Sequence, residues 1–302
     1  MKNLVLLILA LIMSFLKSMG QKPDYEVIFL DQYYSEYIAS AKQSDEDLTD
    51  LYLKKVRTPI FHKYFLSSEY NSFVYEDLAR PSLDIPYLEK TLKEIASNKK
   101  QIKKTVIKAL KECNKLLKSD KMTIYILPSS SELKTMVQDM SGVFGFTAGS
   151  SQVLISIDPT IKDWQKMLPY AVAHEYNHTY WTKKNLATVT KWTLLDYLVF
   201  EGRGDYFAKL LYPKIETPWT EALTEEKRQE LWQKIQPHLE NQDFSFQAEV
   251  IFGSYRFPMW GGYCLGYDIV QSSLSKDNSS TPETWINFPS EQILNSSTYQ
   301  NK

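Results

Sequence analysis

Cysteine is nearly absent from this chain of 302 residues, which contains only Cys113 and Cys264. Two cysteines cannot form the network of disulfide bonds that stabilises small secreted scaffolds, so the fold must rest on a hydrophobic core. An excess of positive charge is also lacking, because 35 Lys and Arg residues stand against 36 Asp and Glu residues. This balance argues against nucleic acid as the main partner. Hydrophobic residues make up 43% of the chain, enough for one large domain or for a domain with a smaller appendage.

Long hydrophobic runs are lacking as well, except at the start of the chain. Lys2 is followed by an apolar run over residues 4–16 and then by the small residues Ser18 and Gly20 around Met19, which is the layout of a secretory signal peptide. We predict a signal peptide over residues 1–20 that is cleaved after Gly20. An uncleaved membrane anchor and a buried first helix are the alternatives, although the run is shorter than the about 20 apolar residues of a spanning helix.

This signal predicts that the mature protein is exported, either secreted or periplasmic, with no stable membrane span after cleavage. A compartment outside the cytoplasm would allow a disulfide bond between Cys113 and Cys264. No feature of the sequence requires that bond, and the position of Cys113 on the apolar side of a helix favours a core thiol.

Glycine is missing between Gln21 and Ser141. A long glycine-free stretch with scattered prolines is typical of helices joined by short turns, so we predict a mainly helical N-terminal region over residues 21–119. Its clearest helix is amphipathic, and the lysines on its polar side indicate either a solvated face or a basic helix at a membrane surface. The apolar positions are Ile102, Val106, Ile107, Leu110, Cys113 and Leu117, and the lysines are Lys99, Lys100, Lys103, Lys104, Lys108, Lys111, Lys115 and Lys118.

The hydrophobic period changes after residue 120, where segments rich in β-branched residues appear. Met122–Leu127 predicts one strand and Gln152–Ile157 predicts a second, each followed closely by a proline. A short helix is expected over residues 131–138, and Gly142–Ser151 is expected to form a loop that carries glycines. Long helical patterns then return, so we predict an α+β fold with a small sheet.

Histidine is rare, yet two of the four histidines lie four positions apart in the segment His174-Glu175-Tyr176-Asn177-His178. Apolar residues at helical spacing precede this His-Glu-x-x-His motif, so we expect it on a helix. Residues i and i+4 share a helix face, and His174 and His178 can therefore present two imidazoles to one metal ion. Glu175 is rotated by about 100° from His174, which suits a general base for an attacking water better than a ligand.

A catalytic zinc site needs a third protein ligand and one open position. A third histidine six residues after His178 would stand at position 184, which is Lys184, so the variant with three histidines is excluded. A carboxylate from the next helix remains, and Glu201 and Asp205 lie four positions apart in an otherwise hydrophobic stretch over residues 192–212. Buried carboxylates are costly unless they are paired or metal-bound. We therefore predict Glu201 as a metal ligand and Asp205 as the partner of a ligand imidazole.

The segment HEYNH, followed 23 residues later by EGRGD, resembles the HExxH…ExxxD pattern of the gluzincins, the thermolysin-like zinc metallopeptidases. The segments GFTAGSSQVLISIDP, FEGRGDYFA, PMWGGYCLGYDIV and FPSEQILNSSTY resemble a bacterial family of predicted zinc-dependent proteases over residues 115–300. The resemblance implies one zinc ion per chain. Arg203 departs from the family pattern, because a small or apolar residue is expected between the two glycines, and we expect it to put a cation near the site. The implied ligands are His174, His178 and Glu201, with Glu175 as the base and Asp205 as an outer partner.

The residue that stabilises the oxyanion is less sharply defined. The segment GGYCLGY at residues 261–267 resembles a Gly-Tyr-x-x-Gly stretch of the same family, and a phenol can donate to a tetrahedral intermediate. We favour Tyr263 as this catalytic donor, while a place in an aromatic core is the alternative for Tyr263 and for Tyr267. His238 could serve instead, and Arg256 could either bind a substrate carboxylate or form a structural ion pair.

These patterns together predict a gluzincin-like metallopeptidase core with a small sheet, a His-Glu-x-x-His helix and a Glu helix, within a zinc metallopeptidase domain over residues 120–302. The expected reaction is hydrolysis of peptide bonds by a zinc-activated water, with Glu175 as general base. Residues 152–157 are expected to be the edge strand that pairs with a peptide or protein substrate. The alternatives are a zinc hydrolase of a non-peptide amide, an exported zinc-containing binding module, and a helical interaction protein that acts through residues 21–119.

Overall fold

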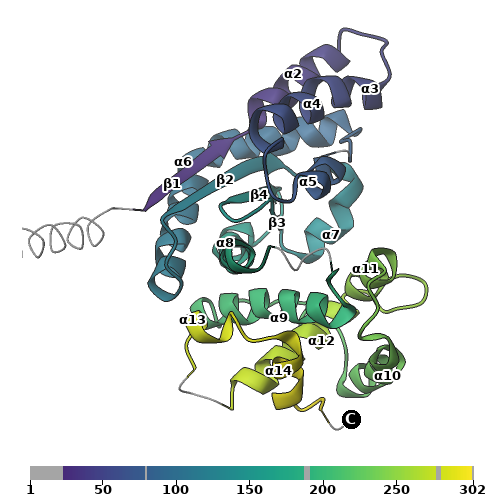
Figure 1. Ribbon diagram of the computed structural model, residues 1–302. Helices are drawn as coiled ribbons and strands as arrows, with labels where there is room; N and C mark the ends of the chain where they lie inside the picture. Colours follow the sequence, from purple (N-terminus) through teal and green to yellow (C-terminus); the bar gives the residue numbers. More distant parts are fainter. Residues whose placement is uncertain (1–22, 79, 187–190, 277–279, 301–302) are drawn as a thin grey trace, which may run out of the picture.

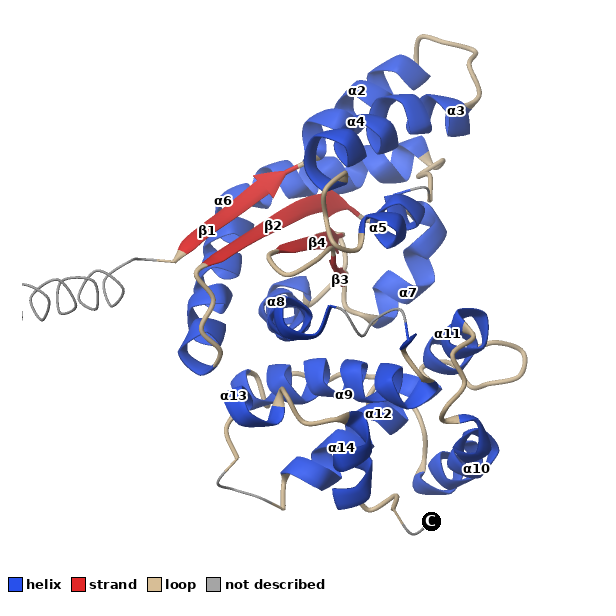
Figure 2. Ribbon diagram, viewed as in Figure 1, coloured by secondary structure: helices blue, strands red, loops and turns tan. Residues whose placement is uncertain are grey.

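The computed structural model describes residues 23–300 apart from residue 79, residues 187–190 and residues 277–279 (Figure 1). The predicted signal peptide over residues 1–20 lies outside the described residues. The described chain has a mixed α+β fold with one small sheet and many helices (Figure 2). None of the described helices combines the length and the hydrophobicity that crossing a membrane requires.

Four strands form the sheet in the order β1-β2-β4-β3. The pairs β1–β2 and β2–β4 are parallel, and β3 runs antiparallel to β4. Val27 of β1 lies opposite Ile124 of β2, and Ile126 of β2 lies opposite Ile155 of β4. The strands are β1 (Asp24–Phe29), β2 (Lys121–Pro128), β3 (Val143–Thr147) and β4 (Gln152–Ile157).

The two strands predicted from the sequence are confirmed as β2 and β4, but two further strands were not predicted. The sequence patterns indicated no strand before residue 119, whereas β1 lies there and pairs with β2. The expected loop over residues 142–151 is wrong in its first half, because β3 forms there. The prediction that residues 152–157 form an edge strand is also wrong, because β3 occupies that edge and β4 is interior. A glycine inside VFGFT suggested a loop, while pairing with β4 is what makes this short segment a strand.

Helices cover both faces of the sheet, so its central strands are buried on both sides. Ile124 and Ile126 of β2 join the core beneath α6 and α8, whereas Tyr125 and Leu127 join the core of the N-terminal helices. The N-terminal helices, α6 among them, are α2 (Asp31–Ala41), α3 (Leu48–Tyr52), α4 (Thr58–Ile60), α5 (Asn71–Leu78) and α6 (Ile85–Leu116), with π-helical turns at Leu53–Arg57 and Phe61–Phe65. Residues of α6 belong to both cores.

The remaining helices follow β2 and build the rest of the molecule, with α9 to α14 in a layer below α8 (Figure 1). Within this layer α9 and α12 approach so closely that a Cβ atom on Gly202 would lie 2.1 Å from the carbonyl oxygen of Gly266. The elements are α7 (Lys134–Asp139) after a 3-10 turn (Ser131–Leu133), α8 (Trp164–Asn185), α9 (Leu194–Leu211), α10 (Glu225–Ile235) with a 3-10 turn (Gln236–His238), α11 (Phe244–Phe252), α12 (Gly261–Leu274), α13 (Pro282–Trp285) and α14 (Ser290–Ser296).

The two cysteines are both buried and both free. Cys113 lies in α6 and Cys264 in α12. Burial raises the pKa of each thiol above its ordinary value, so both behave as small apolar core residues and not as reactive thiolates.

Candidate metal centre

Two packed helices, α8 and α9, supply the residues that the sequence singled out for metal binding. The His-Glu-x-x-His motif lies within α8, where the whole segment from residue 170 to residue 179 is buried. α9 begins with a capping box in which Thr193 and Asp196 satisfy each other's backbone N–H groups. This fixed start sets the register of α9, two turns ahead of Glu201.

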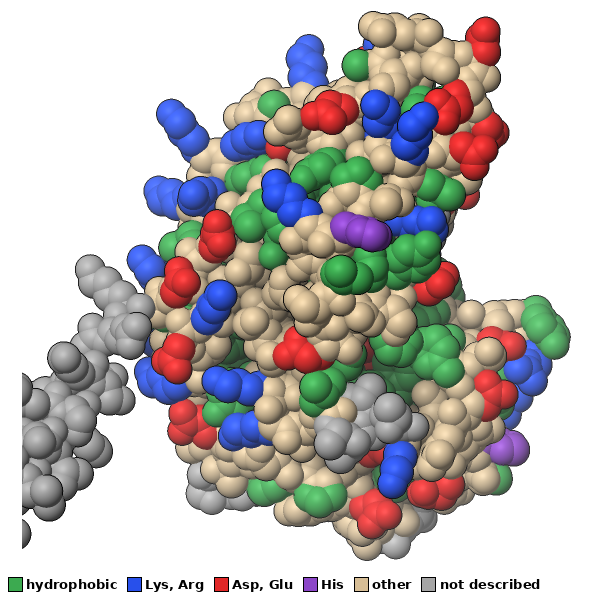
Figure 3. Space-filling view, turned by 45° about the horizontal axis from the view of Figure 1, so that its top comes forward, with side chains coloured by type: hydrophobic (Ala, Val, Ile, Leu, Met, Phe, Trp, Pro, Cys, Tyr) green, Lys and Arg blue, Asp and Glu red, His purple; other side chains and the backbone are tan. Residues whose placement is uncertain are grey.

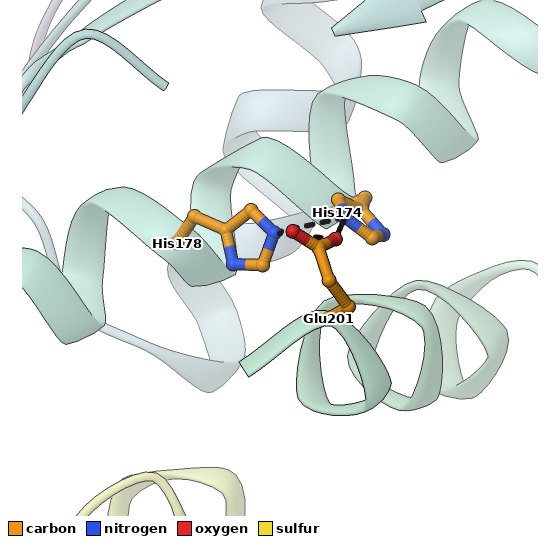
Figure 4. A group of neighbouring side chains, drawn as sticks. All are labelled: His174, His178 and Glu201. Atoms are coloured by element: carbon orange, nitrogen blue, oxygen red, sulfur yellow. Dashed lines mark hydrogen bonds and ion pairs between the residues drawn. The ribbon is translucent and has the colours of Figure 1, made fainter. Parts of the chain in front are cut away.

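The three predicted ligands point at one another (Figure 4). Nε2 of His174 lies 2.9 Å from Nε2 of His178 and 3.2 Å from Oε2 of Glu201, and Nε2 of His178 lies 3.5 Å from the same oxygen. Zinc–ligand distances of about 2.0–2.2 Å place the donors of a tetrahedral site about 3.4 Å apart. Three protein donors at this spacing can hold a metal ion and leave a position for water or substrate.

The charges around the three donors favour a cation at this point. Burial would lower the pKa of His174, but the carboxylates of Asp205 and Glu201 raise the pKa of His174 well above its ordinary value. Burial would raise the pKa of Glu201, but the two imidazoles lower the pKa of Glu201 to about 2. The side chains of His174, His178 and Glu201 belong to residues only 9%, 3% and 7% exposed. The cluster is therefore largely buried and negatively biased, which favours a metal cation.

Asp205 lies against the first histidine of the motif, where the sequence predicted the partner of a ligand imidazole. Its Oδ1 lies 3.3 Å from Nδ1 of His174. An N–H at Nδ1 that donates to this carboxylate leaves the Nε2 lone pair free for a metal. The hydroxyl of Tyr170 also donates to Oδ1 of Asp205 over 2.8 Å, and the indole Nε1 of Trp219 donates to Oδ1 over 3.0 Å. Asp205 is thus a fully buried carboxylate with three partners.

Glu175 lies beside the ligands but against the edge strand β3. Its Oε2 accepts a hydrogen bond of 2.7 Å from the hydroxyl of Thr147. A Cβ atom on Gly145 would lie only 2.5 Å from Cγ of Glu175, so only glycine fits at this point of the strand. Burial raises the pKa of Glu175 despite the nearby imidazoles. A buried carboxylate with a raised pKa readily accepts and keeps a proton, which is what a general base needs.

A cleft of about 910 Å³ opens onto this cluster, and Glu175, His178 and Glu201 line it. In Figure 3 a hollow lined by hydrophobic side chains separates the upper and lower parts of the molecule. Aromatic side chains make up much of its wall, contributed by α5, β3, α9, α11 and α12 and by residues just before α5 and α9. They are Tyr70, Phe73, Phe144, Phe146, Trp192, Tyr197, Phe200, Phe244, Phe252 and Tyr263.

Tyr263 lines this cleft from α12, the helix that contains residues 261–267. Burial and the negative charge of Glu201 raise the pKa of Tyr263 well above its ordinary value. Tyr197 also lines the cleft, one helical turn before Glu201, and burial and the same carboxylate raise its pKa too. Both phenols therefore remain protonated donors. Tyr197 was not predicted from the sequence as a site residue, although its spacing of four residues from Glu201 places both on one helix face.

Three other residues that the sequence singled out have partners elsewhere. Arg203 is buried on α9, and its Nη2 donates to the carbonyl oxygen of Phe288 in the C-terminal segment; its guanidinium is thus turned to that segment, contrary to the expectation of a cation beside the metal ligands. Arg256 forms an ion pair of 2.6 Å with Glu249. The ring of His238 packs edge-on against Phe246.

Comparison with known proteins agrees with this geometry. Residues 102–295 match a family described as Predicted Zn-dependent protease (DUF2268), so the chain belongs to this family of predicted zinc-dependent proteases. Over 130 residues the chain is 31% identical to the uncharacterized protein YjaZ of Bacillus subtilis (strain 168). That alignment covers 41% of this chain and 48% of YjaZ, so the chain spans about half the length of this relative. No solved structure matches.

Proposed function

We propose that this protein is an exported zinc-dependent metallopeptidase of the gluzincin type that hydrolyses peptide bonds. The observation that carries the proposal is the convergence of His174, His178 and Glu201, two of which line the large cleft together with Glu175. Membership of a family of predicted zinc-dependent proteases supports the same reading. We assign the zinc metallopeptidase domain to residues 120–302, the signal peptide to residues 1–20, and a mainly helical region to residues 21–119.

The donor set fits one zinc ion per chain. Two imidazoles and one carboxylate are a common protein ligand set for catalytic zinc, and neither cysteine is in the cluster to suggest a closed structural site. Zinc held there would polarise the scissile carbonyl and lower the pKa of a water molecule toward 7. The protein's own contribution is to orient His174 through Asp205 and to bury the ligands.

Glu175 would take the proton from the attacking water and then give it to the leaving nitrogen. The Thr147 hydroxyl occupies Oε2 of Glu175, which leaves Oε1 available for that proton. Burial of Glu175 stabilises its protonated form, so the carboxyl group can keep the proton until the nitrogen departs. Tyr263, or Tyr197 on the other helix, would donate to the oxygen that becomes negative during attack.

The free side of β3 suits a peptide substrate. Asp158 N–H donates to Gly142 and Ala148 N–H donates to Gln152, each over 2.8 Å. Even-numbered residues of β3 therefore bond to β4, and the backbone N–H and C=O of Gly145 point away from it. An extended peptide can pair with Gly145 and pass directly over Glu175. This arrangement favours a peptide bond over an unrelated amide.

The test combines metal analysis with a peptide screen. Purified protein is loaded with zinc and incubated with a mixed peptide library, and the cleaved bonds are identified by mass spectrometry. Cleavage by the wild type, and none by Glu175→Gln at equal zinc content, supports the proposal. Stoichiometric zinc without cleavage of any peptide in a broad screen would favour a zinc-containing binding module, and hydrolysis of small amides alone would favour the non-peptide hydrolase.

A further inference from the structure

One side of α6 carries a straight row of lysines. With 100° per residue, seven of its lysines fall within about 80° of one another around the helix axis. At about 1.5 Å per residue, the row is roughly 38 Å long. We call these residues the α6 lysine row: Lys90, Lys93, Lys100, Lys104, Lys108, Lys111 and Lys115.

The α6 lysine row lies directly opposite the buried side of the helix. Ile95, Ile102, Val106 and Cys113 are buried in the core on that side. Every member of the row is exposed. Figure 3 shows Lys and Arg side chains projecting along the left edge of the molecule, the side on which α6 lies in Figure 1.

The charges of the α6 lysine row are largely uncompensated. Residues 85–121 contain eleven lysines, no arginine and only four acidic residues, although the whole chain has a net charge of −1. Within the described residues, the one ion pair made by the row is a contact of 3.7 Å between Lys108 and Glu112. Lysines four positions apart, as at 100, 104 and 108, repel one another and weaken a helix. An anionic partner that neutralises the row therefore lowers the electrostatic free energy.

We infer that the α6 lysine row docks the protein on an anionic phospholipid bilayer. A straight row of point charges can meet a flat surface along its whole length at once. Lysine heads attract anionic headgroups within about a Debye length of the surface. No large hydrophobic side chain is exposed in residues 85–121, so binding is electrostatic and peripheral, without insertion into the acyl region. The lack of arginine and of exposed aromatic side chains on this face disfavours nucleic acid.

The path of the chain supports the same orientation. Asp24, the first residue of β1, pairs with Lys121, and its N–H donates to the carbonyl oxygen of Asp120 over 2.8 Å. Strand β1 therefore begins beside the C-terminal end of the α6 lysine row, and the predicted signal peptide over residues 1–20 precedes β1 in the chain. Before that peptide is cleaved, the membrane that receives it lies next to the row. No residue of α6 lines the cleft, so docking leaves the cleft open to substrate.

The experiment measures sedimentation with lipid vesicles. The chain from Gln21 onward, which contains every described residue, and the full chain are mixed with phosphatidylcholine vesicles with or without phosphatidylglycerol. The test variant reverses three unpaired members of the row, Lys100→Glu, Lys104→Glu and Lys111→Glu. The matched control reverses three exposed lysines outside α6, Lys183→Glu, Lys214→Glu and Lys227→Glu, and has the same net charge.

The chain from Gln21 should bind vesicles with phosphatidylglycerol and not those without, and high salt should release it. The test variant should lose at least tenfold in its partition onto these vesicles, while the control keeps wild-type binding. A version with Gln at the same three positions should lose less, which separates charge from misfolding. Equal binding by test and control variants, or equal binding to both kinds of vesicle, would overturn the inference. Tighter, row-dependent binding to heparin or DNA than to vesicles would overturn it as well.

Discussion

The indole Nε1 of Trp219 donates to both carboxylate oxygens of Asp205, over 3.0 Å to Oδ1 and 3.2 Å to Oδ2. The Tyr170 hydroxyl donates to Oδ1 from another direction. These donors hold the Asp205 carboxylate in one orientation, so that it can fix the imidazole of His174. The candidate metal centre is therefore supported by a buried polar network that adds Asp205, Tyr170 and Trp219 to the three predicted ligands.

This network predicts that Asp205→Asn will weaken zinc binding 10–100-fold, the usual cost of losing a partner of a ligand imidazole. Trp219→Phe should cost less, about tenfold or below, because Tyr170 still holds Asp205. Zinc dissociation constants from competition with a chromophoric chelator measure both effects. Tyr212→Phe, which removes a partly buried hydrogen bond to Glu112 away from the cleft, is the matched control. Wild-type affinity in Asp205→Asn would refute its orienting role.

The metal ligands themselves predict a clear stoichiometry. Wild-type protein should bind about one zinc ion per chain, and His178→Ala should bind none at equal free zinc. His62→Ala and His238→Ala should keep full zinc content, because both histidines are exposed and lie outside the cluster. Elemental analysis after gel filtration gives the numbers. Zinc should also raise the thermal unfolding temperature of wild type but not of His178→Ala. An unchanged zinc content in His178→Ala would show that the ligand assignment is wrong.

Gly202 predicts an effect on stability. A Cβ atom there would lie 2.1 Å from the oxygen and 2.4 Å from the carbonyl carbon of Gly266, and backbone cannot give way without moving α12. Gly202→Ala should lower the free energy of unfolding by about 1–3 kcal/mol, even though alanine favours helix by about 1 kcal/mol. Leu210→Ala, on the exposed side of the same helix, should change it by less than about 0.5 kcal/mol. Denaturant titration compares the two, and a more stable Gly202→Ala would contradict the close approach of α9 and α12.

Local patterns were sufficient to predict α8, α9, β2 and β4, because each carries its own periodicity or β-branched run. They also brought together the predicted ligands and Asp205, since i to i+4 spacing on two buried helices leaves few alternatives. The strands β1 and β3 were missed because they depend on pairing with β2 and β4, which lie far away or across a turn. That miss also misplaced the edge strand, because the sequence of β4 does not show which strand lies beside it.

The partners of the site residues were also beyond the sequence. Thr147 meets Glu175 only because β3 lies against α8, and Trp219 meets Asp205 only through the turn that follows α9. Neither contact leaves a spacing pattern in the chain. Tyr170 and Tyr197 differ, because each lies four residues before a metal ligand on the same helix. Because His178 was predicted from the same spacing of four residues, both tyrosines could have been predicted in the same way.

Glu175 is the predicted proton acceptor in the hydrolysis of the peptide bond. Glu175→Gln keeps the size of the side chain and can still accept from Thr147, but it removes the basicity that proton transfer needs. Since general acid–base catalysis is worth about 10²–10⁴-fold in rate, the variant should lose peptide hydrolysis by about that factor. It should retain the fold and its zinc, because Glu175 is not one of the three convergent donors.

Variants that lack a tyrosine hydroxyl in the same cleft provide a comparison for this loss of peptide hydrolysis. Tyr263→Phe should cost about 10²–10³-fold in kcat if its hydroxyl stabilises the oxyanion, and Tyr197→Phe tests the alternative donor. A substrate from the peptide screen provides kcat and KM for each variant, with zinc content measured on the same samples. A transition-state donor should lower kcat and kcat/KM together, whereas a residue that only shapes the cleft should chiefly change KM.

If Glu175→Gln cleaves as fast as wild type, another group accepts the proton, and the gluzincin mechanism fails for this protein. If neither phenol variant lowers kcat, the oxyanion must be stabilised by the metal or by the backbone N–H groups of β3.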